Sequence, residues 1–190
     1  FDLHEPSPGR MAATSAFIAV AVADTRWRDV LDTPAVKSPL AVRALVNGLA
    51  IAGTRIVAVG QRGHVLLSDD AGKSWQQAEV PVSSDLVAVS FPSASTGWAV
   101  GHDGVVLHST NAGGRWIRQL DGHRAGSVLV DYYSRETTGG DSKRAAFLEE
   151  AKRFAAQGAE SPFLDVWFEN ETTGFVVGAF GLILRTTDGG

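Results

Sequence analysis

Three short runs of this sequence combine a hydroxyl, a carboxylate or amide, and a glycine in the same order. They follow the pattern S/T-x-D/N-x-G and comprise Ser68, Asp70 and Gly72; Ser109, Asn111 and Gly113; and Thr186, Asp188 and Gly190. Such residues could coordinate calcium, but one carboxylate in each turn supplies too few oxygen ligands. An aspartate that accepts several backbone hydrogen bonds is also a poor general base, because those bonds lower its pKa. We therefore expect structural turns, in which the short side chains accept backbone N–H groups and glycine adopts the required conformation.

Each of these turns belongs to a longer repeat. The three copies are Gly60 to Trp75, Gly101 to Trp116, and Gly178 to Gly190, each with a G-x-x-G turn, a mainly apolar run and then the polar turn. The first two copies close with Trp75 and Trp116, which are 41 residues apart. This period is typical of propeller blades. We expect each tryptophan to pack back across its hairpin.

The apolar runs within the repeats predict strands that are covered on both faces. The predicted fold class is all-β, a β-propeller, with blades at residues 44–80, 81–120 and 163–190 and an insertion at 121–162. Because a blade buries its faces only against neighbouring blades, three blades leave two apolar faces uncovered. We therefore interpret the chain as the N-terminal part of a longer closed propeller.

The insertion contains a run typical of one amphipathic helix, Asp141 to Gly158. An apolar stripe is formed by Phe147, Leu148, Ala151, Phe154 and Ala155. The stripe could pack on the propeller or form a groove for a partner. Before the helix, Thr137 to Gly140 is predicted to be a flexible hinge.

Each of the first two segments of the chain, 1–23 and 24–43, allows two interpretations. Residues 1–23 are predicted to be a leader, because the apolar run Met11 to Ala23 ends in the small-x-small pattern of a signal-peptidase site. The alternative is a buried strand or helix. In the segment 24–43, Trp27 to Leu31 resembles the residues after each polar turn, which suggests a strand that closes the ring; the alternative is a flexible leader.

Composition excludes several classes of function. The net charge is −4 and there is no lysine or arginine run, which argues against a nucleic-acid partner. There is no cysteine, so disulfides and thiol chemistry are excluded. The histidines do not have metal-binding spacing, and no phosphate-binding loop is present. We expect no cofactor, no metal and no membrane insertion after a signal is removed.

The G-x-x-G turns supply the candidate binding residues, which are Arg62, His102, Asp103 and Phe180. Each turn is predicted to have two central residues between glycines, as a tight hairpin requires. In a four-stranded blade these turns emerge on the same side as the insertion, so the two should form one interaction face. A G-x-x-G loop also occurs in RNA-binding KH modules, but there it joins helices.

The polar turn resembles the Asp-box of BNR-repeat propellers, and the larger repeat resembles the photosystem II stability and assembly-factor family. Gly97 to Gly101 and Gly174 to Gly178 carry this resemblance. It implies a seven-bladed, non-enzymatic propeller that is exported to the periplasm or thylakoid lumen and binds proteins during membrane-complex assembly. The helical insertion is more similar to the proteobacterial branch, whose members often occur beside RND-type exporters, so such an exporter is a further candidate partner.

A glycosidase is the alternative, since sialidases also carry Asp-boxes. Their chemistry needs several arginines, an acidic aspartate and a tyrosine nucleophile assisted by glutamate. The tyrosines here are Tyr132 and Tyr133, in the insertion near Asp131, Arg135 and Glu136. We expect that segment to be too flexible for such a site.

Overall fold

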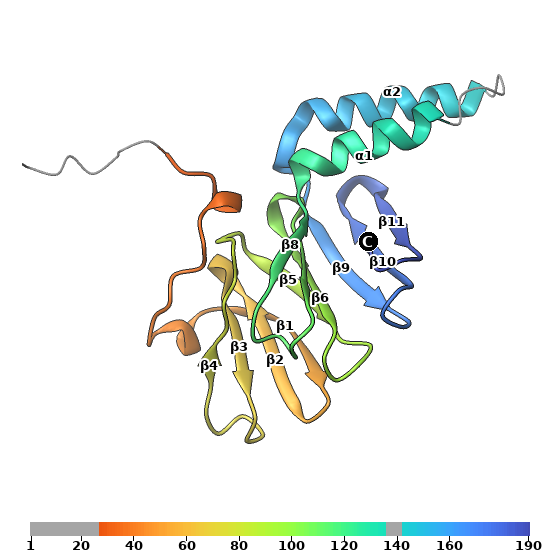
Figure 1. The fold of residues 1–190 in the computed structure, drawn as a ribbon. Helices are drawn as coiled ribbons and strands as arrows, with labels where there is room; N and C mark the ends of the chain where they lie inside the picture. The colour runs from red at the N-terminus through yellow and green to blue at the C-terminus, as the bar shows by residue number, and fades with distance from the viewer. Residues whose placement is uncertain (1–26, 136–141) are drawn as a thin grey trace, which may run out of the picture.

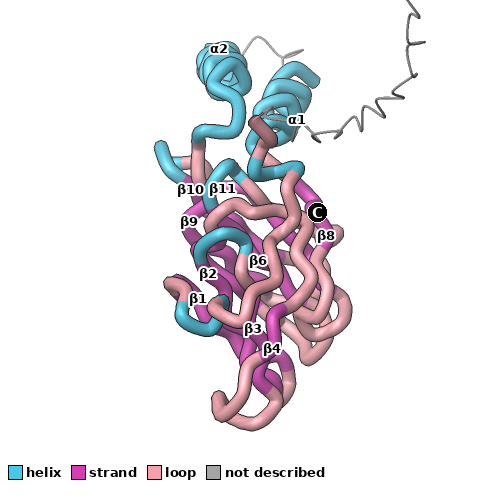
Figure 2. The backbone as a smooth tube through the Cα atoms, turned by 90° about the vertical axis from the view of Figure 1, so that its left-hand side faces the viewer, coloured by secondary structure: helices cyan, strands magenta, loops and turns pink. Residues whose placement is uncertain are grey.

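The computed structural model describes residues 27–135 and 142–190. The predicted leader 1–23 and the predicted hinge Thr137 to Gly140 lie outside the described residues. The described residues form three antiparallel sheets with two helices at one end (Figures 1 and 2).

The sheets are consecutive meanders, in which each strand pairs with the next one along the chain. Blade 1 contains β1 (Val46–Ala52), β2 (Arg55–Gly60), β3 (Val65–Ser68) and β4 (Gln76–Gln77). Blade 2 contains β5 (Leu86–Ser90), β6 (Gly97–Gly101), β7 (Val106–Ser109) and β8 (Ile117–Leu120). Blade 3 contains β9 (Phe163–Phe168), β10 (Gly174–Gly178) and β11 (Ile183–Thr186). The predicted all-β propeller architecture is therefore confirmed for these three sheets.

The blades are held together by apolar side chains between their faces. Val57, Val59 and Leu67 of blade 1 pack with Leu86 and Trp116 of blade 2 in one buried cluster. Burying each such side chain contributes roughly 1.5–3 kcal/mol relative to leaving it exposed.

The second interface, between blades 2 and 3, is centred on an aromatic stack. The indole ring of Trp98 lies 3.6 Å from the ring of Phe168, with the two planes 5° apart. Trp98 is 1% exposed, and its Nε1 donates a hydrogen bond to Oε1 of Gln119. Its polar N–H is thus satisfied inside a largely apolar contact.

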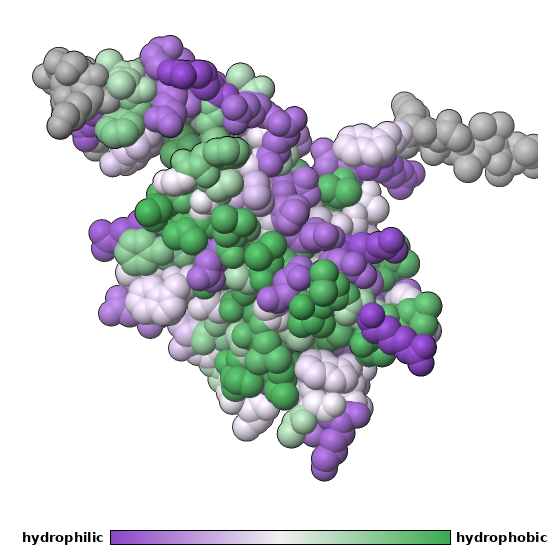
Figure 3. Space-filling view, turned by 180° about the vertical axis from the view of Figure 1, so that it is seen from behind, coloured by the Kyte–Doolittle hydropathy of each residue, from purple (hydrophilic) through white to green (hydrophobic). Residues whose placement is uncertain are grey.

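The two outer blade faces expose apolar side chains, as three adjacent blades should. Leu49 and Ile51 are exposed on blade 1, and Phe175 and Ile183 are exposed on blade 3. Seen from behind, hydrophobic residues extend over much of the surface formed by the sheets (Figure 3). In blade 2, the residue that corresponds to Phe175 is Trp98, and blade 3 covers it.

The insertion contains two helices, α1 (Gly122–Arg135) and α2 (Ser142–Gln157), which corrects the prediction of a single helix. A Cβ added at Gly126 would lie 2.5 Å from the Cα of Ala155, so α2 approaches α1 more closely than a larger residue would allow. Gly126 therefore serves helix packing rather than flexibility. Of the predicted stripe on α2, Ala151 is buried and Phe154 packs against the cluster between blades 2 and 3. Phe147 is instead exposed and stacks near Tyr133, 5.6 Å between ring centroids.

The segment after Trp27 runs beside blades 1 and 2. Residues Val30–Asp32 form a 3-10 turn, η1, and Leu31 is buried in the cluster between these blades. The backbone N–H of Ser83 donates to the carbonyl of Val30 at 2.9 Å. Leu31 thus anchors this segment to blades 1 and 2, and the closing strand stays a prediction. A second 3-10 turn, η2 (Ala41–Arg43), leads into β1.

His108 is a titratable side chain in the interface between blades 2 and 3. Its ring lies 4.7 Å from that of Trp98, at 20°, and its Nε2 is buried without a hydrogen-bond partner. Burial lowers the pKa of His108 below its ordinary value of 6.5. The unfolded chain therefore binds a proton more readily, and the stability contributed by neutral His108 is lost as the pH falls below 6.5.

We predict that His108→Leu reduces the loss of thermal stability on acidification. Leu67 occupies the corresponding position of blade 1 and packs there without a titratable group. The Tm of wild-type protein should fall more than that of the variant between about pH 7.5 and pH 5. His102→Leu, at an exposed position, is the matched control and should keep the wild-type slope. Equal slopes for wild type and His108→Leu would contradict the prediction.

Candidate functional site

The three turns between the second and third strands of the blades have the same unusual backbone. They form the 3-10 turns η3 (Gln61–Gly63), η4 (His102–Gly104) and η7 (Ala179–Gly181). Each has three residues inside its closing hydrogen bond rather than the predicted two, as the bond from Gly60 N–H to the His64 carbonyl shows. Arg62, Asp103 and Phe180 have φ of 56°, 58° and 58°, a left-handed conformation that L-residues seldom adopt.

The helical pair is seated on the turn of blade 2. A Cβ at Gly104 would lie 2.7 Å from the Cα of Gly122, and one at Gly122 would lie 2.8 Å from the Asp103 carbonyl oxygen. The 3-10 turn η6 (Gly158–Glu160), which ends the insertion, also lies against η4. The turns and the helices consequently share one end of the molecule (Figure 1).

A groove of about 580 Å³, here called the turn groove, lies at this end. It is lined by the N-terminal segment, the connection before β5, the turn η4, the start of α1 and the turn η6. Among the predicted binding residues, His102 and Asp103 line this groove. The backbone N–H of Arg62 donates to Oδ1 of Asp85 at 2.7 Å, which places η3 at its edge. Phe180 does not line it and is 88% exposed.

The turn groove is acidic. Its lining includes the carboxylates of Asp29, Asp85, Asp103 and Glu160 and contains no lysine or arginine. Oδ2 of Asp29 lies 3.3 Å from Nε2 of His123, which joins the N-terminal segment to α1. A backbone hydrogen bond from Leu31 and the contact with His123 lower the pKa of Asp29. Asp29 is therefore ionised at neutral pH.

Sequence reasoning found the part of this groove that lies on the repeats and missed the rest. Asp29, His123 and Glu160 come from outside the repeats and meet only in the folded chain. Ser84 and Asp85 lie in the connection that precedes β5, which emerges at the same end of the blade as η4. The sequence could have indicated Ser84 and Asp85 only through their place in a connection at that end of the blade.

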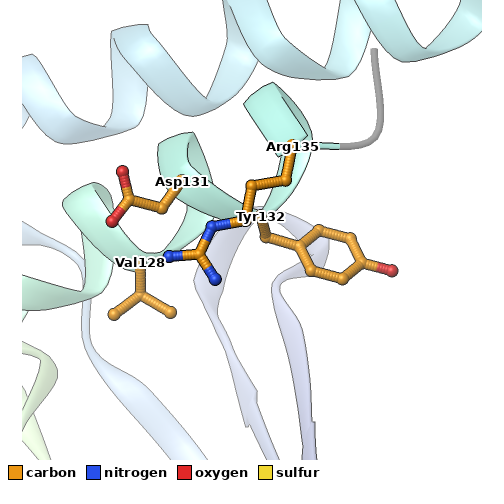
Figure 4. A pocket seen from close by; sticks show the side chains of 4 residues that line it. All are labelled: Val128, Asp131, Tyr132 and Arg135. Atoms are coloured by element: carbon orange, nitrogen blue, oxygen red, sulfur yellow. The ribbon is translucent and has the colours of Figure 1, made fainter. Parts of the chain in front are cut away.

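A second, open hollow of about 390 Å³ lies along α1 and is lined by Val128, Asp131, Tyr132 and Arg135. In Figure 4 the Arg135 side chain extends back along the helix toward Val128, and the Tyr132 ring points outward. These residues include three of the predicted glycosidase set, and they lie on a helix rather than in the flexible segment expected from the sequence. Arg135 is the one basic residue in the lining.

The polar turns lie at the opposite end of the blades (Figure 1) and use their side chains internally. Ser68 Oγ accepts from the Gly72 N–H at 2.8 Å and donates to Oδ1 of Asp70 at 2.9 Å. In blade 2, Ser109 Oγ accepts from the Gly113 N–H at 3.1 Å and donates to Asn111 Oδ1 at 3.0 Å.

The tryptophans after these turns pack in different surroundings. The indole N–H of Trp116 donates to the Gly113 carbonyl at 2.8 Å, and the side chain is 2% exposed. Trp75 is half-buried and packs against Ala58 and Leu66.

In the third copy of the polar turn, Thr186 Oγ1 donates to Asp188 Oδ1 at 2.8 Å, and Gly190 N–H donates to the same oxygen at 3.2 Å.

Asp70 has the most strongly bonded carboxylate of the three turns. The Ser74 hydroxyl and backbone N–H and the Ser68 hydroxyl lower its pKa to about 2, from an ordinary value of 3.8. Because the folded pKa is the lower one, the stability from ionised Asp70 is present above pH 3.8 and is lost as the pH falls toward 2.

We predict that Asp70→Ala lowers the Tm at neutral pH, whereas Asp70→Asn stays close to wild type because Asn111 serves the same turn in blade 2. Between about pH 4 and pH 2, Asp70→Asn should lose less stability than wild type, since it has no proton to take up. Thermal unfolding across this range measures both effects. A neutral-pH Tm for Asp70→Asn as low as that of Asp70→Ala would show that the turn requires the charge.

Two kinds of site were not found in the described parts of the chain. Residues 27–135 and 142–190 contain no cluster of three or more histidine, aspartate or glutamate side chains that could hold a metal ion. Neither of the helices α1 and α2 described there is long and apolar enough to cross a membrane.

Comparison with known proteins finds one family model that resembles the first two repeats. Residues 43–127 match the family model described as photosynthesis system II assembly factor YCF48. None of the curated proteins matches this chain.

Two solved structures share the fold. One is "YCF48 bound to D1 peptide", with 18% identity and a TM-score of 0.51; the match covers 77% of this chain and 38% of that one. The other is "YCF48 from Cyanidioschyzon merolae", with 21% identity, a TM-score of 0.51 and the same coverage. The chain thus spans 38% of the length of these structures, and at this identity they show the fold alone. The predicted resemblance to this family is confirmed, because residues 43–127 match the model of the photosynthesis system II assembly factor YCF48 family.

Proposed function

We propose that this protein is a non-enzymatic propeller scaffold that binds other proteins at the end formed by the turns η3, η4 and η7 and the helices α1 and α2. The observation that carries the proposal is the seating of the insertion on η4, which adds a groove and a helical surface to that end. Phe180, on η7, is the most exposed of the large hydrophobic side chains described there. An aromatic side chain at such a position is typical of an interface anchor.

The comparison with YCF48 supports peptide or protein binding as the activity. One of the solved YCF48 structures is bound to a D1 peptide, so a propeller of this fold can take a polypeptide segment as its ligand. For this chain we extend the proposal to the assembly or stability of a membrane complex, with an RND-type exporter as one candidate. Export to the periplasm or thylakoid lumen is part of the same proposal, and the run Met11 to Ala23 supports it.

No feature of the described residues favours the glycosidase alternative. A sialidase site requires several arginines that converge on the carboxylate of its substrate. The hollow on α1 that holds Tyr132 provides Arg135 alone. The arrangement fits a contact surface better than an active site.

We predict that Phe180→Ser and Arg62→Glu weaken the capture of native partners without unfolding the protein. Both side chains are exposed, so their replacement removes contact area or reverses a charge without disturbing the cores between the blades. The measurement is cross-linking of tagged protein in its native host, followed by quantitative mass spectrometry of the captured proteins. Loss of an anchor residue should reduce capture about tenfold or more.

Ile117→Ser and Arg115→Glu are the matched controls, because they replace a large hydrophobic side chain by serine and an arginine by glutamate at exposed positions away from the turn end. Their capture should equal that of wild type. Equal capture by all four variants would refute binding at the turn end, and a lower Tm of a variant would assign its loss to unfolding.

A further inference from the structure

We infer that Asn47 is a site of spontaneous deamidation, and that this reaction loosens the interface between blades 1 and 2. Gly48 follows Asn47 directly, whereas the other two asparagines of the sequence, Asn111 and Asn170, are followed by alanine and glutamate. A glycine leaves its backbone nitrogen open to close approach, because it has no side chain. The inference is independent of the proposed binding function.

The reaction needs no reagent other than water. The backbone nitrogen of Gly48 attacks Cγ of Asn47 and gives up its proton, while the bond from Cγ to Nδ2 breaks and ammonia leaves with that proton. The product is a succinimide ring between the two residues. Water then opens the ring at either of its carbonyl groups, which gives aspartate or isoaspartate at position 47.

Asn47 occupies a bulge in β1. The pairing of β1 with β2 passes from Val46 to Gly48 on one strand while it advances by one residue on the other, so Asn47 has no partner in the ladder. The same bulge recurs in blades 2 and 3, with Val87 and Leu164 as the extra residues. Blade 1 is thus the one described blade with an amide side chain at this position. The side chain of Asn47 is exposed, so water reaches the site of the reaction.

The packing of the blades explains why this labile pair of residues is present. A Cβ added at Gly48 would lie 2.9 Å from the carbonyl oxygen of Val87, so β5 approaches β1 too closely for a side chain there. Nδ2 of Asn47 donates a hydrogen bond to the carbonyl oxygen of Leu86 at 2.8 Å, across the same interface. Each residue serves the contact between blades 1 and 2 for its own reason, and together they form the reactive dipeptide.

Deamidation reverses the polarity of the contact with Leu86. Asn47 makes this contact through an N–H donor, whereas an ionised aspartate has oxygen acceptors only and would face a carbonyl oxygen. Leu86 is fully buried and belongs to the apolar cluster between the two blades, where a lost hydrogen bond is costly. The isoaspartate product also adds a methylene group to the main chain of β1, which disturbs its register with β2.

The first test follows each asparagine by peptide mapping and mass spectrometry while the purified protein is kept folded at mildly alkaline pH. Replacement of the amide –NH2 by –OH raises the mass of the peptide that contains it. We expect Asn47 to react at least about tenfold faster than Asn111 and Asn170, which are also exposed but lack the following glycine. The variant Asn47→Gln keeps the N–H donors but needs a larger ring, so the fast reaction should disappear. A rate at Asn47 no higher than at the other two asparagines, or a fast reaction that persists in Asn47→Gln, would overturn the inference.

The second test measures the Tm of Asn47→Asp, which carries one of the two reaction products. We expect a Tm about 4 °C below that of wild type, because a hydrogen bond at the edge of a buried interface is replaced by a repulsive contact.

Asn170→Asp is the matched control for this measurement. Asn170 uses its side-chain oxygen, which accepts from the backbone N–H groups of Thr172 and Thr173. An aspartate retains both bonds, so the Tm should stay close to that of wild type. If Asn47→Asp lowered the Tm no more than Asn170→Asp does, the inferred loosening of the interface would be refuted.

Discussion

The structure depends on the burial of one sheet face against the next. Within blade 2, Ala99 and Leu107 face blade 1 and Trp98 and Val106 face blade 3, so alternate residues of one strand serve two interfaces. This requirement explains why the strands of the sequence are apolar at successive positions. It also fixes the blades rigidly, because a one-residue shift of register would exchange the two sets of side chains.

The same packing leaves the ends of the blades free to differ. At the polar-turn end, hydroxyl and carboxylate groups such as Ser68 and Asp70 bond to one another and to the backbone of the turn. At the other end, Asp103 has a positive φ and is followed by Gly104. The resulting turn is small enough for the helical insertion to pack on it. The chain places its insertion there, at the end of blade 2 opposite to its polar turn.

The repeated elements could be predicted from the sequence because each is specified locally and three times. The insertion was only half predicted, since α1 contains two glycines and two valines, which lower its intrinsic preference for a helix. Its stability comes from α2, which packs on Gly126 through Ala155, and from Ala125 in the core between the blades. Tertiary contact of this kind has no local sequence signal.

The turn groove shows the same limit in a functional site. His102 and Asp103 are marked by the repeat, whereas Asp29 and Glu160 are separated by more than half the chain and become neighbours only through folding. Asp29 in turn contacts His123 of α1, 94 residues further along the chain, and only the fold creates that contact.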